Sequence, residues 1–188
     1  DLWLDRAYLK WQPKCAEGLT VLAGKMGMPF VSVGNLIWDA DVNPEGAAVQ
    51  YEWQFDEKTS AFANAGGFWV EESGSDAEIA MWGIQGGLNH KIDQDQSLTG
   101  GVTYYDYANI KGDEVLSYDD DYARGGNTVT EAGGDLFYEY DYNIVELFGE
   151  YGHKMLGLPS GVYGQFVNNI ASGVSADQGW LVGYRLNK

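Results

Sequence analysis

Residues 49–55 read Val-Gln-Tyr-Glu-Trp-Gln-Phe, so that apolar and polar side chains alternate at every position. Successive side chains of a β-strand point to opposite faces, and this alternation is therefore typical of a strand with two unlike faces. The apolar face holds Val49, Tyr51, Trp53 and Phe55, and the polar face holds Gln50, Glu52 and Gln54. We expect such a strand to separate an apolar environment from a polar one.

The same alternation recurs along the chain, whereas helical periodicity is absent almost everywhere. Short turns separate some of the segments, and long acidic excursions follow the second and the sixth, at about 27–45 and 108–132. Two other connections, near 71–77 and 156–160, are shorter, so the alternation of loop lengths is imperfect. The ten expected strands are 2–11, 19–26, 46–55, 61–70, 78–90, 96–107, 133–141, 143–154, 161–169 and 178–187.

Strands of this length favour a transmembrane β-barrel over a soluble β-sandwich, whose strands usually have about 5 to 6 residues. In lipid every backbone polar group must pair within the protein, so only helices and closed barrels can span the bilayer. No stretch of the sequence approaches the roughly 20 apolar residues of a membrane-spanning helix. We therefore expect an all-β fold, an antiparallel transmembrane β-barrel, with residues 1–188 as one barrel domain or as a segment of a larger barrel.

The amino-acid composition excludes several classes of function and of site. The 28 acidic and 11 basic residues give a formal net charge of -17, which argues against a nucleic-acid binder, because such proteins neutralise phosphates with clustered Lys and Arg. The single cysteine, Cys15, rules out a disulfide framework and a cysteine-based zinc site. His90 and His153 lack the spacing of a catalytic triad or a zinc site. We expect no enzymatic activity and no cofactor.

One acidic stretch has the spacing of a cation site. Asp39, Asp41, Asn43 and Glu45 place oxygen-bearing side chains at alternate positions, as calcium loops do. The sixth position of such a loop needs a glycine but is Pro44, and the twelfth needs an acid but is Gln50. The alternatives are a calcium site and a structural loop of Asx turns, and the two mismatches favour the loop. A second acidic run, 119–121, leaves the same two alternatives.

Three segments near the start of the chain are Arg-Ala-Tyr-Leu-Lys-Trp at 6–11, Ala-Gly-Lys-Met at 23–26 with Pro-Phe at 29–30, and the loop at 36–46. Together they resemble the putative porins of Gram-negative outer membranes. The most specific piece is Trp-Asp-x-Asp-x-Asn-Pro-Glu-Gly at 38–46. The resemblance implies a β-barrel in the outer membrane of a Gram-negative bacterium and a passive diffusion function. Because porins with a water channel have about 16 to 18 strands, this chain is expected to be a segment of one.

The expected function is an outer-membrane porin, or part of one, that lets small hydrophilic solutes or cations diffuse through a water-filled lumen. Its partners are outer-membrane lipid and these solutes, and homo-oligomer formation is left open. The residues expected to line the pore are Arg6, Lys10, Gln50, Glu52, Gln54, Glu139, Asp141, Glu146, Glu150, Gln165 and Arg185. Five acids against three bases predict a mild preference for cations, because carboxylates in a pore favour them.

Two other functions remain open from the sequence. A small closed barrel without a conducting lumen would act as an envelope anchor or adhesin through its acidic loops, and a filled interior would distinguish it. A soluble β-sandwich would bind carbohydrate through exposed Trp and Tyr side chains, and it would need no detergent.

Overall fold

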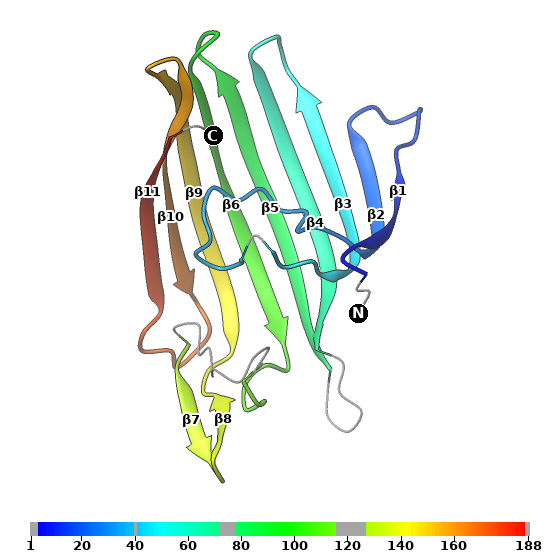
Figure 1. Ribbon diagram of the computed structural model, residues 1–188. Helices are drawn as coiled ribbons and strands as arrows, with labels where there is room; N and C mark the ends of the chain where they lie inside the picture. Colours follow the sequence, from blue (N-terminus) through cyan, green and yellow to red (C-terminus); the bar gives the residue numbers. More distant parts are fainter. Residues whose placement is uncertain (1–3, 40, 72–77, 116–126, 187–188) are drawn as a thin grey trace.

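A computed structural model describes residues 4–39, 41–71, 78–115 and 127–186 (Figure 1). These residues form eleven β-strands and no helix, and accordingly no helix among them is long and apolar enough to cross a membrane. The strands are β1 (Ala7–Trp11), β2 (Leu19–Lys25), β3 (Glu45–Gln54), β4 (Thr59–Glu71), β5 (Ile79–Lys91), β6 (Ser97–Ala108), β7 (Val129–Ala132), β8 (Asp135–Tyr138), β9 (Tyr142–Met155), β10 (Leu158–Asn169) and β11 (Gln178–Leu186).

Nine of these strands form one antiparallel sheet in the order β1-β2-β3-β4-β5-β6-β9-β10-β11. Each strand pairs with its neighbour along the chain, apart from the excursion between β6 and β9, and the sheet curves around one face (Figure 1). The expected all-β antiparallel fold is confirmed. Within the described residues the sheet is not closed, since β1 and β11 are its two edges.

The expectation of one sheet strand over 133–141 is wrong. Residues 129–138 instead form a separate hairpin, in which β7 pairs only with β8, and β6 pairs directly with β9. The hairpin turns at Gly133 and Gly134, which adopt positive φ values of 68° and 105°, a conformation that glycine reaches without steric cost. The alternating Leu136 and Tyr138 are buried in a small core cluster with Ile110, so their pattern reflects packing beside the sheet.

With this hairpin outside the sheet, the connections at one end of the sheet have two to seven residues and those at the other end have seven or more. The connections after β1, β3, β5 and β9 lie at one end of the sheet, which we call the short-turn rim. The connections after β2, β4, β6 and β10 lie at the other end, the long-loop rim, and the longest of them carries the β7-β8 hairpin. The expected connection at 156–160 is in fact a two-residue turn at the short-turn rim.

One face of the sheet, here called the outer face, exposes apolar side chains along nearly its whole width. The row that contains Val49 continues through Ala65, Ile84 and Tyr104 on successive strands, and Ile84 is 61% exposed. Exposed apolar surface of this extent marks a face that contacts a membrane or another protein. Its large exposed side chains include Leu9, Trp11, Val49, Trp53, Trp69, Trp82, Ile84, Leu88, Leu98, Val102, Tyr104, Leu147, Val162, Phe166, Trp180, Val182 and Tyr184.

The opposite, inner face is covered by residues 26–39, which we call the crossing segment. This segment leaves β2 at the long-loop rim and runs across the strands toward β10 and β11 (Figure 1). Met26, Phe30 and Val33 are its buried anchors. The ring of Phe30 lies against Gly83, where an added Cβ would come within 2.4 Å of the ring. A larger residue at 83 would therefore displace the segment.

Candidate functional site

A row of buried polar side chains crosses the middle of the inner face beneath the crossing segment. Gln50, Asn64, Gln85, Thr103 and Glu146 are directly opposed on successive strands from β3 to β9. Asn64 Nδ2 donates to Gln85 Oε1 over 2.9 Å, and Gln85 Nε2 donates to Thr103 Oγ1 over 2.9 Å. These two bonds join Asn64, Gln85 and Thr103 into one hydrogen-bond network, as buried polar groups require.

Glutamine side chains of the sheet hold the backbone of the crossing segment. Gln85 accepts a hydrogen bond from the Val31 amide at 2.7 Å and donates one to the Val31 carbonyl at 2.8 Å. Gln50 Nε2 donates to the Pro29 carbonyl at 2.7 Å, and Gln165 Oε1 accepts from the Leu36 amide at 3.3 Å. These side chains satisfy backbone groups that a strand would pair with a neighbouring strand, so the segment lies in one place without joining the sheet.

Two of the acids expected to line a pore are covered. Glu146 is 2% exposed and accepts hydrogen bonds from Gln165 Nε2 at 2.7 Å and from the Tyr105 hydroxyl at 3.4 Å. Glu150 is also buried and pairs with Arg185 Nη2 at 2.7 Å. Arg185 in turn donates to the Val33 carbonyl. Glu146 therefore lies beneath the crossing segment, and the Glu150–Arg185 pair lies next to it.

The remaining expected pore residues are placed differently. Glu52 and Gln54 lie on the inner side of β3 near the short-turn rim and are exposed. Lys10, on edge strand β1, is exposed and lies opposite Leu22, while Arg6 donates to Asn43 Oδ1 at 2.8 Å. Glu139 and Asp141 lie between β8 and β9, outside the sheet, so the structure does not bring them together with the others.

The acidic stretch 39–45 forms a braced loop. Asp39 Oδ1 accepts a hydrogen bond from the Asp41 amide at 3.3 Å, and Asn43 Nδ2 donates to Asp5 Oδ1 at 2.8 Å. Glu45 starts β3 and pairs with Lys25 in the register of the sheet. Within the described residues no group of three or more His, Cys, Asp or Glu side chains is placed to hold a metal ion. Residues 119–121 lie outside the described part of the chain.

Sequence reasoning missed the crossing segment and the residues that hold it. Asn64 lies on a strand rich in Ala and Gly, whose two faces are hard to tell apart from composition. The available signal was Gln85 itself, a polar residue within the otherwise apolar run 79–88. Its partner, Val31, is 54 residues away along the chain.

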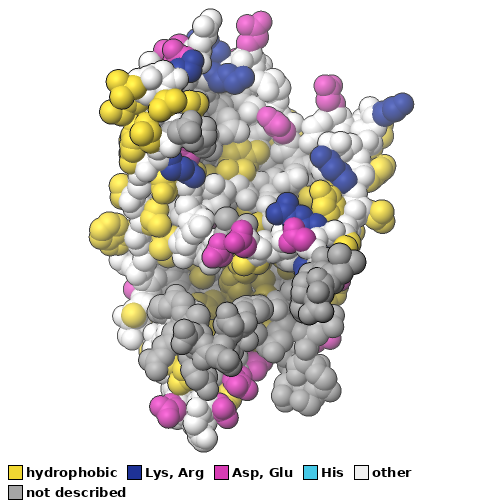
Figure 2. All heavy atoms as spheres, viewed as in Figure 1, with side chains coloured by type: hydrophobic (Ala, Val, Ile, Leu, Met, Phe, Trp, Pro, Cys, Tyr) yellow, Lys and Arg dark blue, Asp and Glu magenta, His cyan; other side chains and the backbone are white. Residues whose placement is uncertain are grey.

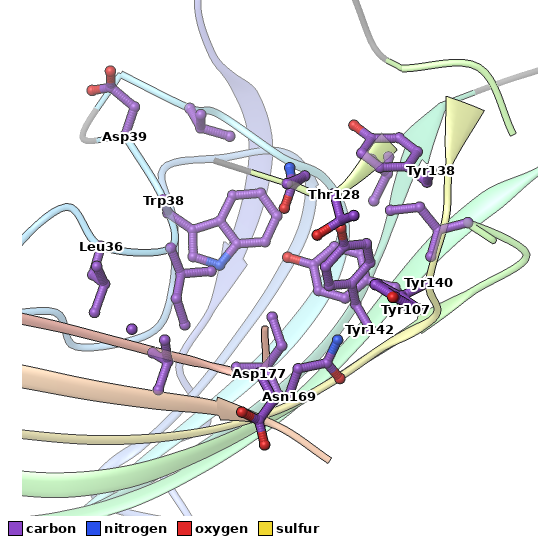
Figure 3. Close-up of a pocket in the computed structure, with 18 of the residues that line it drawn as sticks. Leu36, Trp38, Asp39, Tyr107, Thr128, Tyr138, Tyr140, Tyr142, Asn169 and Asp177 are labelled. Atoms are coloured by element: carbon purple, nitrogen blue, oxygen red, sulfur yellow. The ribbon is translucent and has the colours of Figure 1, made fainter. Parts of the chain in front are cut away.

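A cavity of about 920 Å³ opens at the long-loop rim. We call it the rim cavity. Its wall includes the end of the crossing segment, the ends of β6 and β9, and the connection between β10 and β11 (Figure 3). Figure 2 shows this face of the molecule hollowed, with hydrophobic side chains at the floor of the hollow.

Comparison with known proteins places the chain in a family. A family model described as "Putative porin" matches residues 1–132, which include the first six strands of the sheet and the crossing segment. Comparisons with curated proteins and with solved structures find no match.

Proposed function

The chain belongs to the putative porin family, and on this premise we propose that it is an outer-membrane porin, or part of one, in a Gram-negative bacterium. Small hydrophilic solutes would cross by diffusion through a water-filled lumen, with a mild preference for cations. The proposal involves no catalytic step and no cofactor.

The observation that carries the proposal is the contrast between the two faces of the sheet. The outer face exposes apolar side chains on strand after strand, whereas the inner face carries the polar row from Gln50 to Glu146. Transmembrane barrels alternate in this way, with apolar residues toward lipid and polar residues toward the lumen. Short turns at one rim and long loops at the other also fit this class, whose long loops face the outside of the cell.

The crossing segment would narrow the lumen. It lies on the inner face about midway between the rims (Figure 1), and it covers Glu146 and Gln165. In the proposed pore, solutes therefore meet the uncovered side of this segment rather than the buried row beneath it. Asn35 is an exposed polar residue of the segment.

The burial pattern changes which acids would produce the cation preference. Glu146 is covered and Glu150 is paired with Arg185, so both contribute little field to open solvent. Asp39, Asp41 and Glu52 are exposed, and exposed carboxylates near a mouth raise the local concentration of cations. We expect neutralising Asp39 and Asp41 to reduce the preference more than neutralising Glu146.

Conductance measurements test the proposal directly. The full-length protein, inserted into a planar lipid bilayer under a KCl gradient, should give discrete conductance steps and a reversal potential that favours K⁺ over Cl⁻. The preference should weaken in concentrated salt, because the Debye length falls from about 10 Å at 0.1 M to about 3 Å at 1 M. Anion selectivity would contradict the cation preference. Protein that inserts but never conducts would favour a non-conducting barrel that acts as an envelope anchor or adhesin.

A further inference from the structure

The rim cavity has the size and lining of a ligand site. Its volume of about 920 Å³ lies within the range of about 300 to 1,000 Å³ that small-molecule pockets occupy. It is built by residues far apart in the sequence, from the crossing segment at 36–39 to the connection at 174–179. The braced loop at 39–43 forms part of its margin.

Aromatic rings form a continuous part of the wall. The ring of Trp38 stacks on that of Tyr107, with 6.0 Å between centroids and 20° between planes. Tyr142 meets the edge of Tyr107 at 6.3 Å and that of Tyr138 at 6.0 Å. Figure 3 shows the rings of Trp38, Tyr107, Tyr138 and Tyr142 among the residues that line the cavity. Because each ring is held by the next, the wall is formed before any ligand arrives.

Three polar side chains, those of Asn169, Asp177 and Thr128, lie close to the aromatic wall. Asn169 is fixed in place, since its side chain donates to the Asp141 carbonyl and accepts from the amides of Asn143 and Ala171. The side chains of Asp177 and Thr128 also line the cavity, and neither makes a hydrogen bond within the described part of the chain. A carboxylate and a hydroxyl are therefore available to a ligand.

The charge of the lining selects against anions. The described residues around the cavity include four carboxylates, those of Asp5, Asp39, Asp41 and Asp177, and one ammonium group, that of Lys25. A phosphorylated or carboxylated solute would be repelled here. The solute class that fits must be uncharged or cationic, must offer an apolar face to aromatic rings, and must offer hydroxyl groups to Asp177 and Thr128.

We propose that the rim cavity binds a neutral saccharide of one or two rings. A pyranose presents C–H groups on one face, which suits the electron-rich face of an aromatic ring, and hydroxyl groups around its edge, which suit carboxylate and hydroxyl partners. The site would retain sugars at the outer mouth of the lumen, ahead of the crossing segment. This placement rests on the proposed function, whereas binding itself does not.

Calorimetry of the full-length protein in detergent tests the site without requiring conduction. Maltose and cellobiose are the saccharide probes, glucose 6-phosphate is the anionic probe and choline the cationic one. We expect saturable binding of at least one disaccharide, and none of glucose 6-phosphate. Asp177→Asn should weaken disaccharide binding about tenfold, since a hydrogen bond to a charged group is lost.

Matched tryptophan variants locate the binding. Trp38→Leu should abolish disaccharide binding, whereas Trp180→Leu, at a highly exposed position of the outer face, should leave it unchanged. Asp177→Asn lies at the rim and keeps the test decisive if Trp38→Leu fails to fold. Binding of choline alone, binding of no probe, or binding insensitive to both site variants would overturn the proposal. A conducting protein that binds no disaccharide would refute the saccharide site and leave the porin function standing.

Discussion

At the scale of single residues, the side chain of Gln85 forms the backbone hydrogen bonds that a neighbouring strand would otherwise form with Val31. It pairs with both the amide and the carbonyl of Val31 and also joins Asn64 to Thr103. A polar residue in an apolar strand is visible in the sequence, but its partners are not, because they come from another segment and from two other strands. The need for a partner was thus predictable from burial chemistry, and its identity was not.

Replacing Gln85 should release the crossing segment. Gln85→Met keeps the approximate shape of the side chain but leaves the Val31 amide and carbonyl without their partner. We expect a loss of about 1 to 3 kcal/mol in the free energy of unfolding for each group left buried and unpaired, together with noisier single-channel currents. Unfolding in denaturant and bilayer recordings measure the two effects. Gln94→Met, in an exposed turn, is the control, and an equal loss there would contradict the assignment.

Asp56 gives the turn between β3 and β4 a dependence on pH. Its carboxylate accepts hydrogen bonds from the amides of Lys58 at 2.7 Å and Thr59 at 2.8 Å, and these bonds lower the pKa of Asp56. A carboxyl whose pKa is lower in the folded state stabilises the fold above its unfolded pKa, which is about 3.9. That stabilisation is lost as the pH falls through the lowered folded value.

Asp56→Asn should therefore be less stable than the natural protein at pH 7. The difference should shrink as the pH is lowered below about 4, because the natural carboxyl then becomes protonated in the unfolded state first and in the folded state only at lower pH. Thermal unfolding of both proteins from pH 7 to pH 3 measures this convergence. A difference that stays constant over this range would show that the charge of Asp56 is not involved.

At the scale of elements, the sequence predicted strands more reliably where both faces have distinctive residues. β6, β9 and β11 alternate large apolar with polar or small side chains, and this alternation agrees with the faces that the structure shows. β2 and β4 carry small and apolar residues on both faces, so alternation does not assign their faces. The hairpin β7-β8 was misassigned because alternation alone does not reveal which partner a short strand pairs with.

The path of the crossing segment could not be predicted from the sequence, because its partners are also distant along the chain. It has no regular secondary structure, and it is fixed by contacts such as that between Leu36 and Gln165, 129 residues apart. Its loop at 36–46 was recognised by resemblance as a connection between strands. The path of residues 26–39 across the inner face follows from side chains on β3, β5 and β10, which sequence spacing does not bring together.

Two arginine substitutions on one strand test whether the outer face meets lipid. Val102 and Leu98 lie on the same face of β6 and are both 46% exposed, but Val102 is mid-strand and Leu98 lies near the short-turn rim. In lipid, Val102→Arg should cost about 2 to 4 kcal/mol of unfolding free energy and Leu98→Arg only about 0 to 1. Unfolding from lipid vesicles measures both. Equal small losses would indicate a face exposed to water.

The neighbouring Thr103 cannot serve as the control for this experiment. It points to the inner face but is 0% exposed and hydrogen-bonded to Gln85 beneath the crossing segment. Arginine there would overpack a filled space, so its cost would reveal nothing about lipid. The alternation within β6 indicates that Thr103 faces inward, but only the structure shows that the crossing segment covers it.

At the scale of the whole molecule, the direction of the edge strands limits how the sheet can close. In an antiparallel sheet of nine strands the first and last run the same way, and here both β1 and β11 run from the long-loop rim to the short-turn rim. Pairing β1 directly with β11 would be parallel. A second copy in the same membrane orientation would meet either edge in parallel as well. Antiparallel closure therefore requires an odd number of strands besides these nine.

Cysteine cross-linking distinguishes these arrangements in the full-length protein. In a Cys15→Ser background, the Leu9→Cys and Ala23→Cys pair, directly opposed on β1 and β2, should form a disulfide and serve as the positive control. Leu9→Cys with Val182→Cys on β11 should not, because with at least one strand between them their Cα atoms exceed the roughly 7 Å limit for a disulfide. Placing the second cysteine at Trp180 or Tyr184 covers other registers. A disulfide between β1 and β11 in any of these pairs would show that the nine strands close on themselves, and the lumen would then be too narrow for both the crossing segment and a passing solute.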